Sequence, residues 1–211
     1  MNLPQQFFIA GTDTDVGKTY VSLELIRSLV KKGERVGVMK PVSAGCEWVQ
    51  GEWKNGDALA LMEASNLQQQ YAEVNPYAYE QPVSPHIAAK ISGRAIDLEL
   101  IFDAFQKIKA SSDSVLIEGA GGWLTPISES QSMADIARKL NVQVILVVGI
   151  KLGCLNHAQL TARAIKEAGV SLAGWVANEL DPEMSYLKEN LEMLEGQIDA
   201  PLITQVPYRK Y

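Results

Sequence analysis

A glycine-containing stretch near the start of the chain limits what the chain can fold into. The residues GTDTDVGKT, positions 11–19, follow the apolar run FFIA and lead into YVSLELIRSLVKKG, whose apolar spacing indicates an amphipathic helix. A strand, a glycine-containing loop and a helix in this order are typical of a phosphate-binding loop, where free N–H groups at a helix N-terminus surround an anion. The order predicts an α/β protein.

The loop departs from the usual G-x-x-x-x-G-K-[ST] pattern at one position. Gly11 lies one residue before the place of the first glycine, and Thr12 occupies that place. The loop is still expected to bind an anion, because Gly11 and Gly17 still permit a tight turn. Lys18 can reach terminal phosphates and the hydroxyl of Thr19 can hold Mg²⁺. The alternative is a capped helix with a surface lysine, and we interpret the stretch as a phosphate-binding loop.

Short apolar runs alternate with amphipathic stretches along the whole chain. Runs typical of strands lie at 7–10, 35–40, 114–119, 142–149, 171–178 and 200–207. Amphipathic stretches typical of helices lie at 17–32, 57–64, 97–111, 132–140, 154–168 and 183–196. Continuous apolar strands that alternate with helices predict a mostly parallel central sheet with helices on both faces. A chain of 211 residues with 47% hydrophobic residues and no linker is expected to form one domain, 1–211.

The segment 65–96 is less regular than the rest of the chain. It contains VNPYAYEQPVSPH, which holds three prolines. We expect an irregular insertion here, either functional or simply a covering loop.

Composition excludes several classes of partner. The net charge is −6 and no basic stripe is present, which argues against nucleic acid or an anionic membrane as the main partner. No segment reaches the ~18 apolar residues that a membrane span needs. Two cysteines without C-x-x-C spacing and two histidines do not form a zinc set. We therefore expect a reduced, cytoplasmic protein.

The run VLIEGAGG places a carboxylate at the end of a predicted buried strand. Ligands bind beyond the carboxyl ends of strands in open α/β sheets. Glu118 at such an end can bind Mg²⁺ across from Lys18 and Thr19. The glycines that follow let the backbone approach a ligand closely, although the segment can also be read as a plain flexible turn.

Three more polar residues lie at strand ends or helix starts. Lys40 ends the second strand, and its place between a buried strand and Pro41 is unusual for a solvated lysine. Asp57 opens the next helix, either as a structural N-cap or as a second metal carboxylate. Asn178 ends the strand GWVAN, where its amide can read a nucleobase or cap a turn.

Taken together and in order, the motifs resemble the dethiobiotin synthetases, ATP-dependent enzymes that close the ureido ring in biotin synthesis. The resemblance rests on GTDTDVGKT, MKPVSAG, the Gly56-Asp57 helix start, VNPYAYEQPVSPH, VLIEGAGGW, VVGIKLGCLNHA and AGWVANE, which cover almost the whole chain. It implies a P-loop NTPase fold, a homodimer, and the substrates 7,8-diaminononanoate, carbon dioxide and ATP with Mg²⁺.

The resemblance also implies roles for individual residues. Lys40 and Lys18 would be catalytic, with Lys40 beside a carbamate. The metal would lie among Thr19, Asp57 and Glu118. Residues implied to bind ATP are Asp15, Val16, Gly17, Lys18, Thr19, Tyr20, Asp57, Glu118, Gly119, Ala120, Gly121, Asn178, Glu179 and Pro207. Residues implied to bind the diamine are Ser43, Ala44, Gly153, Cys154 and Asn156.

The chain differs from the family pattern in three places. Asp15 replaces a common glutamate. The hydroxyl residue usually found directly before the glycine of KPVSAG is moved to Ser43, with Ala44 in its place. The chain also ends at Tyr211, soon after the adenine segment.

The segment KLGCLNHA, 151–158, is expected to open a helix whose free N–H groups hold an anion. The resemblance names the anion as the carboxylate of the diamine, presented across a dimer interface, and an ordinary helix start is the alternative. Lys151 at the end of the preceding strand is a further candidate for positive charge near the phosphates.

Two other functions fit a P-loop. One is a nucleotide switch of the partitioning ATPase type, whose loop normally has an additional lysine that residues 12–16 lack. The other is an ATP-dependent amidase of the cobyrinate type, which usually has a glutaminase domain that this chain is too short to contain.

Overall fold

The computed structural model describes residues 3–209 and contains a parallel sheet of six strands. The spatial order is β10-β9-β8-β1-β7-β2, and each neighbouring pair is parallel. The strands are β1 (Gln6–Gly11), β2 (Val36–Met39), β7 (Ser114–Glu118), β8 (Gln143–Ile150), β9 (Leu172–Glu179) and β10 (Leu202–Val206). The predicted mostly parallel sheet is confirmed, with β1 inside the sheet between β7 and β8.

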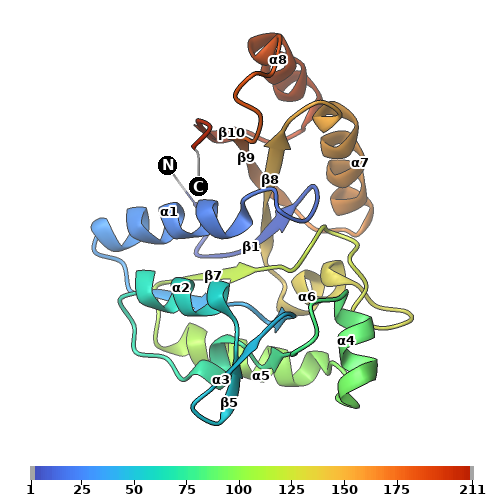
Figure 1. The fold of residues 1–211 in the computed structure, drawn as a ribbon. Helices are drawn as coiled ribbons and strands as arrows, with labels where there is room; N and C mark the ends of the chain where they lie inside the picture. Colours follow the sequence, from blue (N-terminus) through green and yellow to red (C-terminus); the bar gives the residue numbers. More distant parts are fainter. Residues whose placement is uncertain (1–2, 210–211) are drawn as a thin grey trace.

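Helices cover both faces of this sheet (Figure 1). One face packs against α1 (Lys18–Lys31), α2 (Gly56–Ala64) and α3 (Tyr71–Val74). The other packs against α4 (Pro85–Ser92), α5 (Leu98–Ala110), α6 (Met133–Leu140), α7 (Cys154–Glu167) and α8 (Leu187–Gln197). Side chains alternate between the two cores along β1, since Phe7 and Ile9 join one and Phe8 and Ala10 the other. This alternation explains why the strands read as continuous apolar runs.

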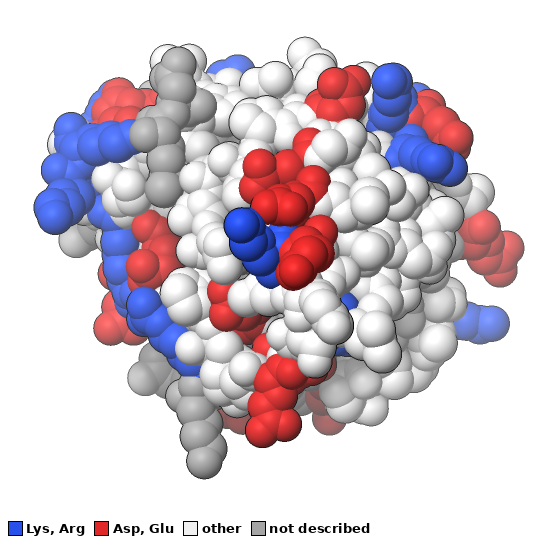
Figure 2. Space-filling view, turned by 90° about the horizontal axis from the view of Figure 1, so that it is seen from above, with Lys and Arg blue, Asp and Glu red and all other residues white. Residues whose placement is uncertain are grey.

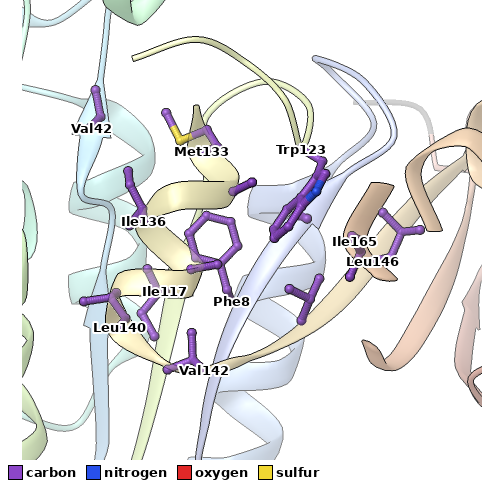
Figure 3. Packing of buried hydrophobic residues seen from close by; sticks show 14 of the residues in the cluster. Phe8, Val42, Ile117, Trp123, Met133, Ile136, Leu140, Val142, Leu146 and Ile165 are labelled. Atoms are coloured by element: carbon purple, nitrogen blue, oxygen red, sulfur yellow. The ribbon is translucent and has the colours of Figure 1, made fainter. Parts of the chain in front are cut away.

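The second core reaches the edge of the cleft described below. In Figure 3 the ring of Phe8 lies between Ile136 of α6 and the indole of Trp123. The rings of Phe8 and Trp123 meet edge to face, with centroids 6.3 Å apart. Trp123 therefore anchors the glycine-rich loop that follows β7 to the sheet.

The segment 65–96 is more regular than its prolines suggested, and the expectation of an irregular insertion is wrong for its second half. Residues Pro85–Ser92 form α4. Pro85 is compatible with the first helical turn, because its missing N–H has no intrahelical partner there. Gly93 ends the helix in the left-handed conformation, with φ of 68°.

Short strands supply the remaining regular structure. β3 (Val42–Ser43) pairs in parallel with β6 (Tyr77–Ala78), and β4 (Glu47–Val49) forms a hairpin with β5 (Glu52–Lys54). Within residues 3–209, no helix is long and apolar enough to cross a membrane. Acidic and basic side chains are interspersed on the face seen from above (Figure 2).

Candidate active site

A cleft of about 980 Å³ opens beyond the carboxyl ends of β1, β2 and β7. This is the place where ligands of parallel α/β sheets bind. Its lining residues are Thr14, Asp15, Gly17, Lys18, Thr19, Tyr20, Lys40, Ser43, Ala44, Asn55, Asp57, Pro82, Val83, Ser84, Pro85, Glu118, Gly119, Ala120, Gly121, Thr125, Pro126 and Leu180. The cleft thus brings together the loop, the lysine, the carboxylates and the glycines predicted from separate strand ends.

The loop between β1 and α1 is shaped by both of its glycines. Gly17 is the N-cap of α1 and has φ of 85°, a conformation that suits glycine. A Cβ atom on Gly11 would lie 2.8 Å from Val16 Cγ2 and 3.0 Å from Lys18 Nζ. Gly11 is therefore required for close packing against the lysine, although it stands one residue before the usual position. Thr12 instead uses its backbone N–H, which donates to the carbonyl oxygen of Val147 on β8.

Asn178, at the end of β9, lies against this loop and does not line the cleft. Its amide nitrogen donates to the carbonyl oxygen of Val16 at 2.8 Å, and its side chain is buried. That hydrogen bond uses one of the two amide N–H donors and holds the side chain toward the loop. Asn178 supports the turn that ends the loop, which agrees with the structural alternative offered for it, although the turn lies 162 positions away in the chain.

Lys18, the lysine that follows the loop, is buried and has a shifted pKa. Only 8% of its surface is exposed, and its ammonium group donates to the carbonyl oxygen of Asp13 at 3.0 Å. Burial lowers the pKa of Lys18 to about 8, with the positive charge of Lys40 acting in the same direction and the carboxylate of Glu118 opposing both. A polyanion in the cleft would stabilise the charged form of Lys18 and so compensate for its loss of contact with water.

Lys40, Asp57 and Glu118 form a charged cluster on the floor of the cleft. The ammonium group of Lys40 lies 2.5 Å from Asp57 Oδ2 and 2.7 Å from Glu118 Oε1. Thr19 Oγ1 donates to the same Glu118 oxygen at 2.8 Å. Burial alone would lower the pKa of Lys40, but the two carboxylates outweigh it and hold that pKa above its ordinary value. Lys40 is thus a permanent cation near neutral pH.

The structural reading of Asp57 as a helix N-cap is wrong. Asn55 is the N-cap of α2, and its side chain accepts from the backbone N–H of Ala58 at 3.2 Å. Asp57 lies in the first turn of α2, and its carboxylate is directed to Lys40. An asparagine before a glycine and an aspartate is a capping signal that the sequence contained.

The cluster fits a magnesium ion. Glu118 Oε2 is buried without a hydrogen-bond partner among the residues described, a costly state for a carboxylate oxygen. Over residues 3–209, no three His, Cys, Asp or Glu side chains gather into a complete metal site. Mg²⁺ is usually held by one or two carboxylates together with substrate phosphates, so it does not need three protein carboxylates. If such an ion binds, Thr19, Asp57 and Glu118 are the residues that would supply oxygens to it.

The segment Gly119–Gly121, which follows β7, lines the cleft. A Cβ atom on Gly119 would lie 2.7 Å from the ring of Phe8, so only glycine fits there. The hydroxyl of Thr125 accepts from the N–H of Gly122 at 2.8 Å and holds the turn. Thr125 lines the cleft and was not expected from the sequence.

The residues implied to line an adenine ring lie at the ends of β9 and β10. Glu179 accepts from Gln205 Nε2 at 2.6 Å and from the backbone N–H of Tyr208 at 3.2 Å. Those contacts tie the segment around the exposed Pro207 to β9. Tyr20 lines the cleft, and the guanidinium of Arg209 lies 5.5 Å from the centroid of its ring.

Gly153, Cys154 and Asn156 do not line the cleft of this chain. Gly153 is the N-cap of α7, and no side chain caps the helix. Cys154 is buried whereas Asn156 is exposed, and the neighbouring Leu152 is 93% exposed. Lys151 is also absent from the cleft lining.

Ser43 and Ala44 both line the cleft, where the sequence predicted a contact with substrate. The hydroxyl of Ser43, however, points to protein partners, since it donates to Asn75 Oδ1 at 2.7 Å. Ser43 is buried, with 1% of its surface exposed. Sequence reasoning missed Asn75, because nothing in a one-dimensional pattern pairs it with a residue 32 positions earlier.

The fold and this cleft define a P-loop nucleotide-binding protein. Solved structures with similar folds include the cell division protein MinD in its complex with MinC from Aquifex aeolicus, with a TM-score of 0.61 and 14% identity over 98% of this chain and 82% of that one. A ParA family ATPase from Chlorobium tepidum has a TM-score of 0.59 and 12% identity over 99% of this chain and 86% of that one. FtsY from Thermotoga maritima has a TM-score of 0.55 and 17% identity over 99% of this chain and 63% of that one. Identities this low show the fold alone.

Sequence comparison identifies the family. A family model described as an AAA domain matches residues 5–211. The chain is 47% identical to the ATP-dependent dethiobiotin synthetase BioD of Aromatoleum aromaticum, over 99% of this chain and 92% of the relative. It is 48% identical to the protein of the same name from Vibrio parahaemolyticus, over 96% of this chain and 89% of the relative. The chain belongs to the dethiobiotin synthetase family and is a ligase.

Proposed function

We propose that this chain makes dethiobiotin from 7,8-diaminononanoate, carbon dioxide and ATP by holding all three in the cleft between the phosphate-binding loop and Lys40. One amine of the substrate captures carbon dioxide as a carbamate and releases a proton. A carbamate oxygen then attacks the γ-phosphorus of ATP and displaces ADP. The second amine attacks the carbon of the mixed anhydride, forms the ring and expels inorganic phosphate. No step needs a covalent bond to the protein, so positioning and positive charge provide the catalysis.

Lys18 and the loop hold the phosphates in this proposal. The open N-terminus of α1 presents free N–H groups to an anion, and the buried ammonium of Lys18 lies next to them. Burial lowers the pKa of Lys18 to about 8. The negative charge of bound ATP would stabilise the protonated form of Lys18. Mg²⁺ bound by Thr19, Asp57 and Glu118 together with phosphate oxygens would neutralise charge on the nucleotide.

Lys40 acts on the reacting groups. It extends from β2, a different strand from the one that leads into the loop, and it is held on Asp57 and Glu118. Its permanent positive charge is suited to stabilise the carbamate and the phosphoryl group that transfers from ATP. This charged cluster, with Lys40 and Glu118 buried and Asp57 half-exposed in a P-loop cleft, is the single observation that carries the assignment.

We propose that the carboxylate tail of the diamine binds at the start of α7 of a partner subunit in a homodimer. Two observations support this place. The N-terminus of α7 carries no side-chain cap, and although the N–H of Cys154 donates to the carbonyl oxygen of Lys151, the next N–H groups of the first turn can bind an anion. The same region exposes Leu152, at 93%, and Leu160, at 57%, which a partner subunit would cover. The exposed Asn156 adds a donor next to the anion.

We further propose that the protein works in the cytoplasm as a single catalytic domain. Both of its cysteines are free and buried, which suits a reducing compartment.

The test of the proposed function is the dependence of phosphate release on the diamine. Purified protein is given ATP and Mg²⁺, with and without 7,8-diaminononanoate and bicarbonate. Phosphate release is expected only when both are added, in a one-to-one ratio with dethiobiotin. Release at the same rate without the diamine would instead indicate a nucleotide-hydrolysing switch.

A further inference from the structure

A ring of hydrogen bonds connects the backbone of Lys40 to the helix that carries Asp57. The amide nitrogen of Asn75 donates to the carbonyl oxygen of Lys40 at 2.6 Å. The amide oxygen of Asn75 accepts from the hydroxyl of Tyr71 at 2.9 Å. The hydroxyl of Tyr71 in turn accepts from the backbone N–H of Asn55 at 2.7 Å. The Lys40–Asp57 ion pair closes the ring, since Asn55 caps α2 and Asp57 lies two residues further on.

Local sequence explains how Lys40 and Asn75 come to face each other. Each precedes a proline, and a residue before a proline is biased toward extended backbone. The backbone N–H of Lys40 donates to the carbonyl oxygen of Val74 at 2.8 Å, which aligns the two segments. Because Pro76 has no N–H to donate, the Asn75 side chain provides the donor to the Lys40 carbonyl oxygen.

The polar groups of Asn75 and Tyr71 are satisfied within the ring. Asn75 is 3% exposed, and its oxygen accepts from Ser43 as well as from Tyr71. The hydroxyl of Tyr71 uses both its donor and its acceptor capacity, on Asn75 and Asn55 respectively. Burial raises the pKa of Tyr71 to about 12, so the hydroxyl keeps its proton at any working pH. Such networks rigidify the elements that they join.

The ion pair between Lys40 and Asp57 needs this support. The side chain of Asp57 is 47% exposed, whereas that of Lys40 is 7% exposed. Half-exposed ion pairs are weak by themselves and do not fix the geometry of their partners. Rate enhancements that depend on positioning are lost when a group moves by about 1 Å. An anchor at the start of α2 would prevent such a shift.

We propose that Tyr71 and Asn75 are positioning residues that hold Asp57 at a set distance from Lys40 and thereby orient the Lys40 ammonium group in the cleft. The proposal rests on the role of Lys40 given under the proposed function. Neither residue lines the cleft, so both act through Lys40 and Asp57 rather than on the substrate.

The chain offers a matched control for the loss of the Tyr71 hydroxyl. The hydroxyl of Tyr77 accepts from the backbone N–H of Asp97 at 2.8 Å, and Asp97 is the N-cap of α5. Tyr71→Phe and Tyr77→Phe therefore each remove a tyrosine hydroxyl that binds a helix N-cap. No residue of α5 lines the cleft. Only Tyr71→Phe therefore removes a member of the ring of hydrogen bonds around Lys40 and Asp57.

The experiment measures kcat, the KM for ATP and the melting temperature of both variants. Tyr71→Phe removes both hydrogen bonds of that hydroxyl and is expected to lower kcat about tenfold, while it changes the KM for ATP less than about twofold. Tyr77→Phe is expected to leave kcat within about twofold of the parent. Tyr71→Phe, which loses two hydrogen bonds, should lose at least as much thermal stability as Tyr77→Phe, which loses the bond to Asp97.

If Tyr71 acts through Asp57, the effects of substituting the two residues on kcat should not be additive. In an Asp57→Asn background, Tyr71→Phe is expected to lower kcat by less than about twofold, because the group that it positions is already altered. An equal tenfold loss in both backgrounds, or equal effects of Tyr71→Phe and Tyr77→Phe, would overturn the positioning role. If Tyr71→Phe does not fold, Asn75→Ser replaces it in the same comparison, since serine is too short to bridge Lys40 and Tyr71.

Lys40→Ala in the same assay distinguishes a failure of the role proposed for Lys40 from a failure of the positioning role proposed for Tyr71 and Asn75. Retained turnover in Lys40→Ala would overturn the role of Lys40 and the positioning proposal together. Lost turnover in Lys40→Ala, combined with equal behaviour of the two tyrosine variants, would overturn the positioning proposal alone.

Discussion

Lys40 and Glu118 form a buried ion pair across neighbouring parallel strands, with 2.7 Å between the ammonium nitrogen and Oε1. Met39 of β2 stands opposite Ile117 of β7, so the next residue of each strand emerges at the same edge of the sheet. Parallel register therefore brings together a cation and an anion that are 78 positions apart in the chain. The pair lies between the loop that would bind phosphate and the wall of the cleft.

Replacing Lys40 separates its role from that of ATP binding. Lys40→Ala is expected to lower kcat by about a hundredfold or more, the usual effect of removing one charge-stabilising group. ATP affinity should change less, because Lys18 and the loop remain. Steady-state kinetics and calorimetry with ATP measure the two quantities, and circular dichroism checks the fold. Loss of ATP affinity in step with activity would show that Lys40 anchors the nucleotide.

The lowered pKa of Lys18 predicts how stability depends on pH. The pKa is about 8 in the folded chain against 10.5 as the ordinary value, so the unfolded chain binds more protons between these pH values. The free energy of unfolding should therefore rise with pH from about 8 to 10.5, and the cost of the charged lysine is fully present below about pH 8.

The variant Lys18→Met removes that cost. At pH 7 the nucleotide-free variant is expected to be more stable by about 1–3 kcal/mol, the scale of a shift of this size, and its turnover should be abolished. Urea unfolding at pH 7 and pH 9.5 measures the difference, which should be smaller at the higher pH. A variant less stable than its parent at pH 7 would contradict the burial of a costly charge.

The displaced glycine of the loop can be tested by adding one methyl group. In Gly11→Ala the new Cβ would lie 2.8 Å from Val16 Cγ2 and 3.0 Å from Lys18 Nζ. Overpacking of this kind typically costs about 1–3 kcal/mol, so ATP affinity should fall about tenfold or more. Gly196→Ala is the control, because a Cβ there meets no atom within 4 Å. Unchanged ATP affinity in Gly11→Ala would mean that the glycine has no part in shaping the loop.

Asn156 tests the site proposed for the substrate carboxylate. Asn156→Ala is expected to raise the KM for the diamine several-fold and to leave the KM for ATP nearly unchanged, because α7 does not line the nucleotide cleft. A diamine whose carboxylate is replaced by a neutral amide should bind the parent less well than the natural diamine does. The same replacement should cause a smaller loss of binding in Asn156→Ala. Equal losses in both enzymes would place the carboxylate elsewhere.

Sequence patterns predicted the sheet well because its strands are buried on both faces. Continuous apolar runs such as the one at 142–149 have few alternatives, and β8 was found at Gln143–Ile150. The helix α4 was missed because three nearby prolines suggested a loop, whereas Pro85 occupies a helical position that tolerates it. Counting prolines over a segment does not distinguish a proline at the start of a helix from one that interrupts it.

The site was predictable where chemistry lies at a strand end and not where it depends on distant side chains. Lys40 and Glu118 were found because Lys40 directly follows the buried β2 and Glu118 is the last residue of the buried β7. The contact of Asn178 with the loop spans 162 positions, and that of Asn75 with Lys40 spans 35. Such pairings follow from tertiary packing, and no local pattern encodes them.

The central claim is that a carbamate oxygen, rather than water, attacks the γ-phosphorus of ATP in this cleft. It is tested most directly with ¹⁸O-labelled carbon dioxide, supplied to the enzyme with the diamine, Mg²⁺ and unlabelled ATP and read before the label exchanges with water. Ring closure expels the attacking oxygen with the phosphate, so each inorganic phosphate should carry one ¹⁸O atom in the mass spectrum. Phosphate without the label, released at the rate of turnover, would show that water attacks ATP and would contradict the account.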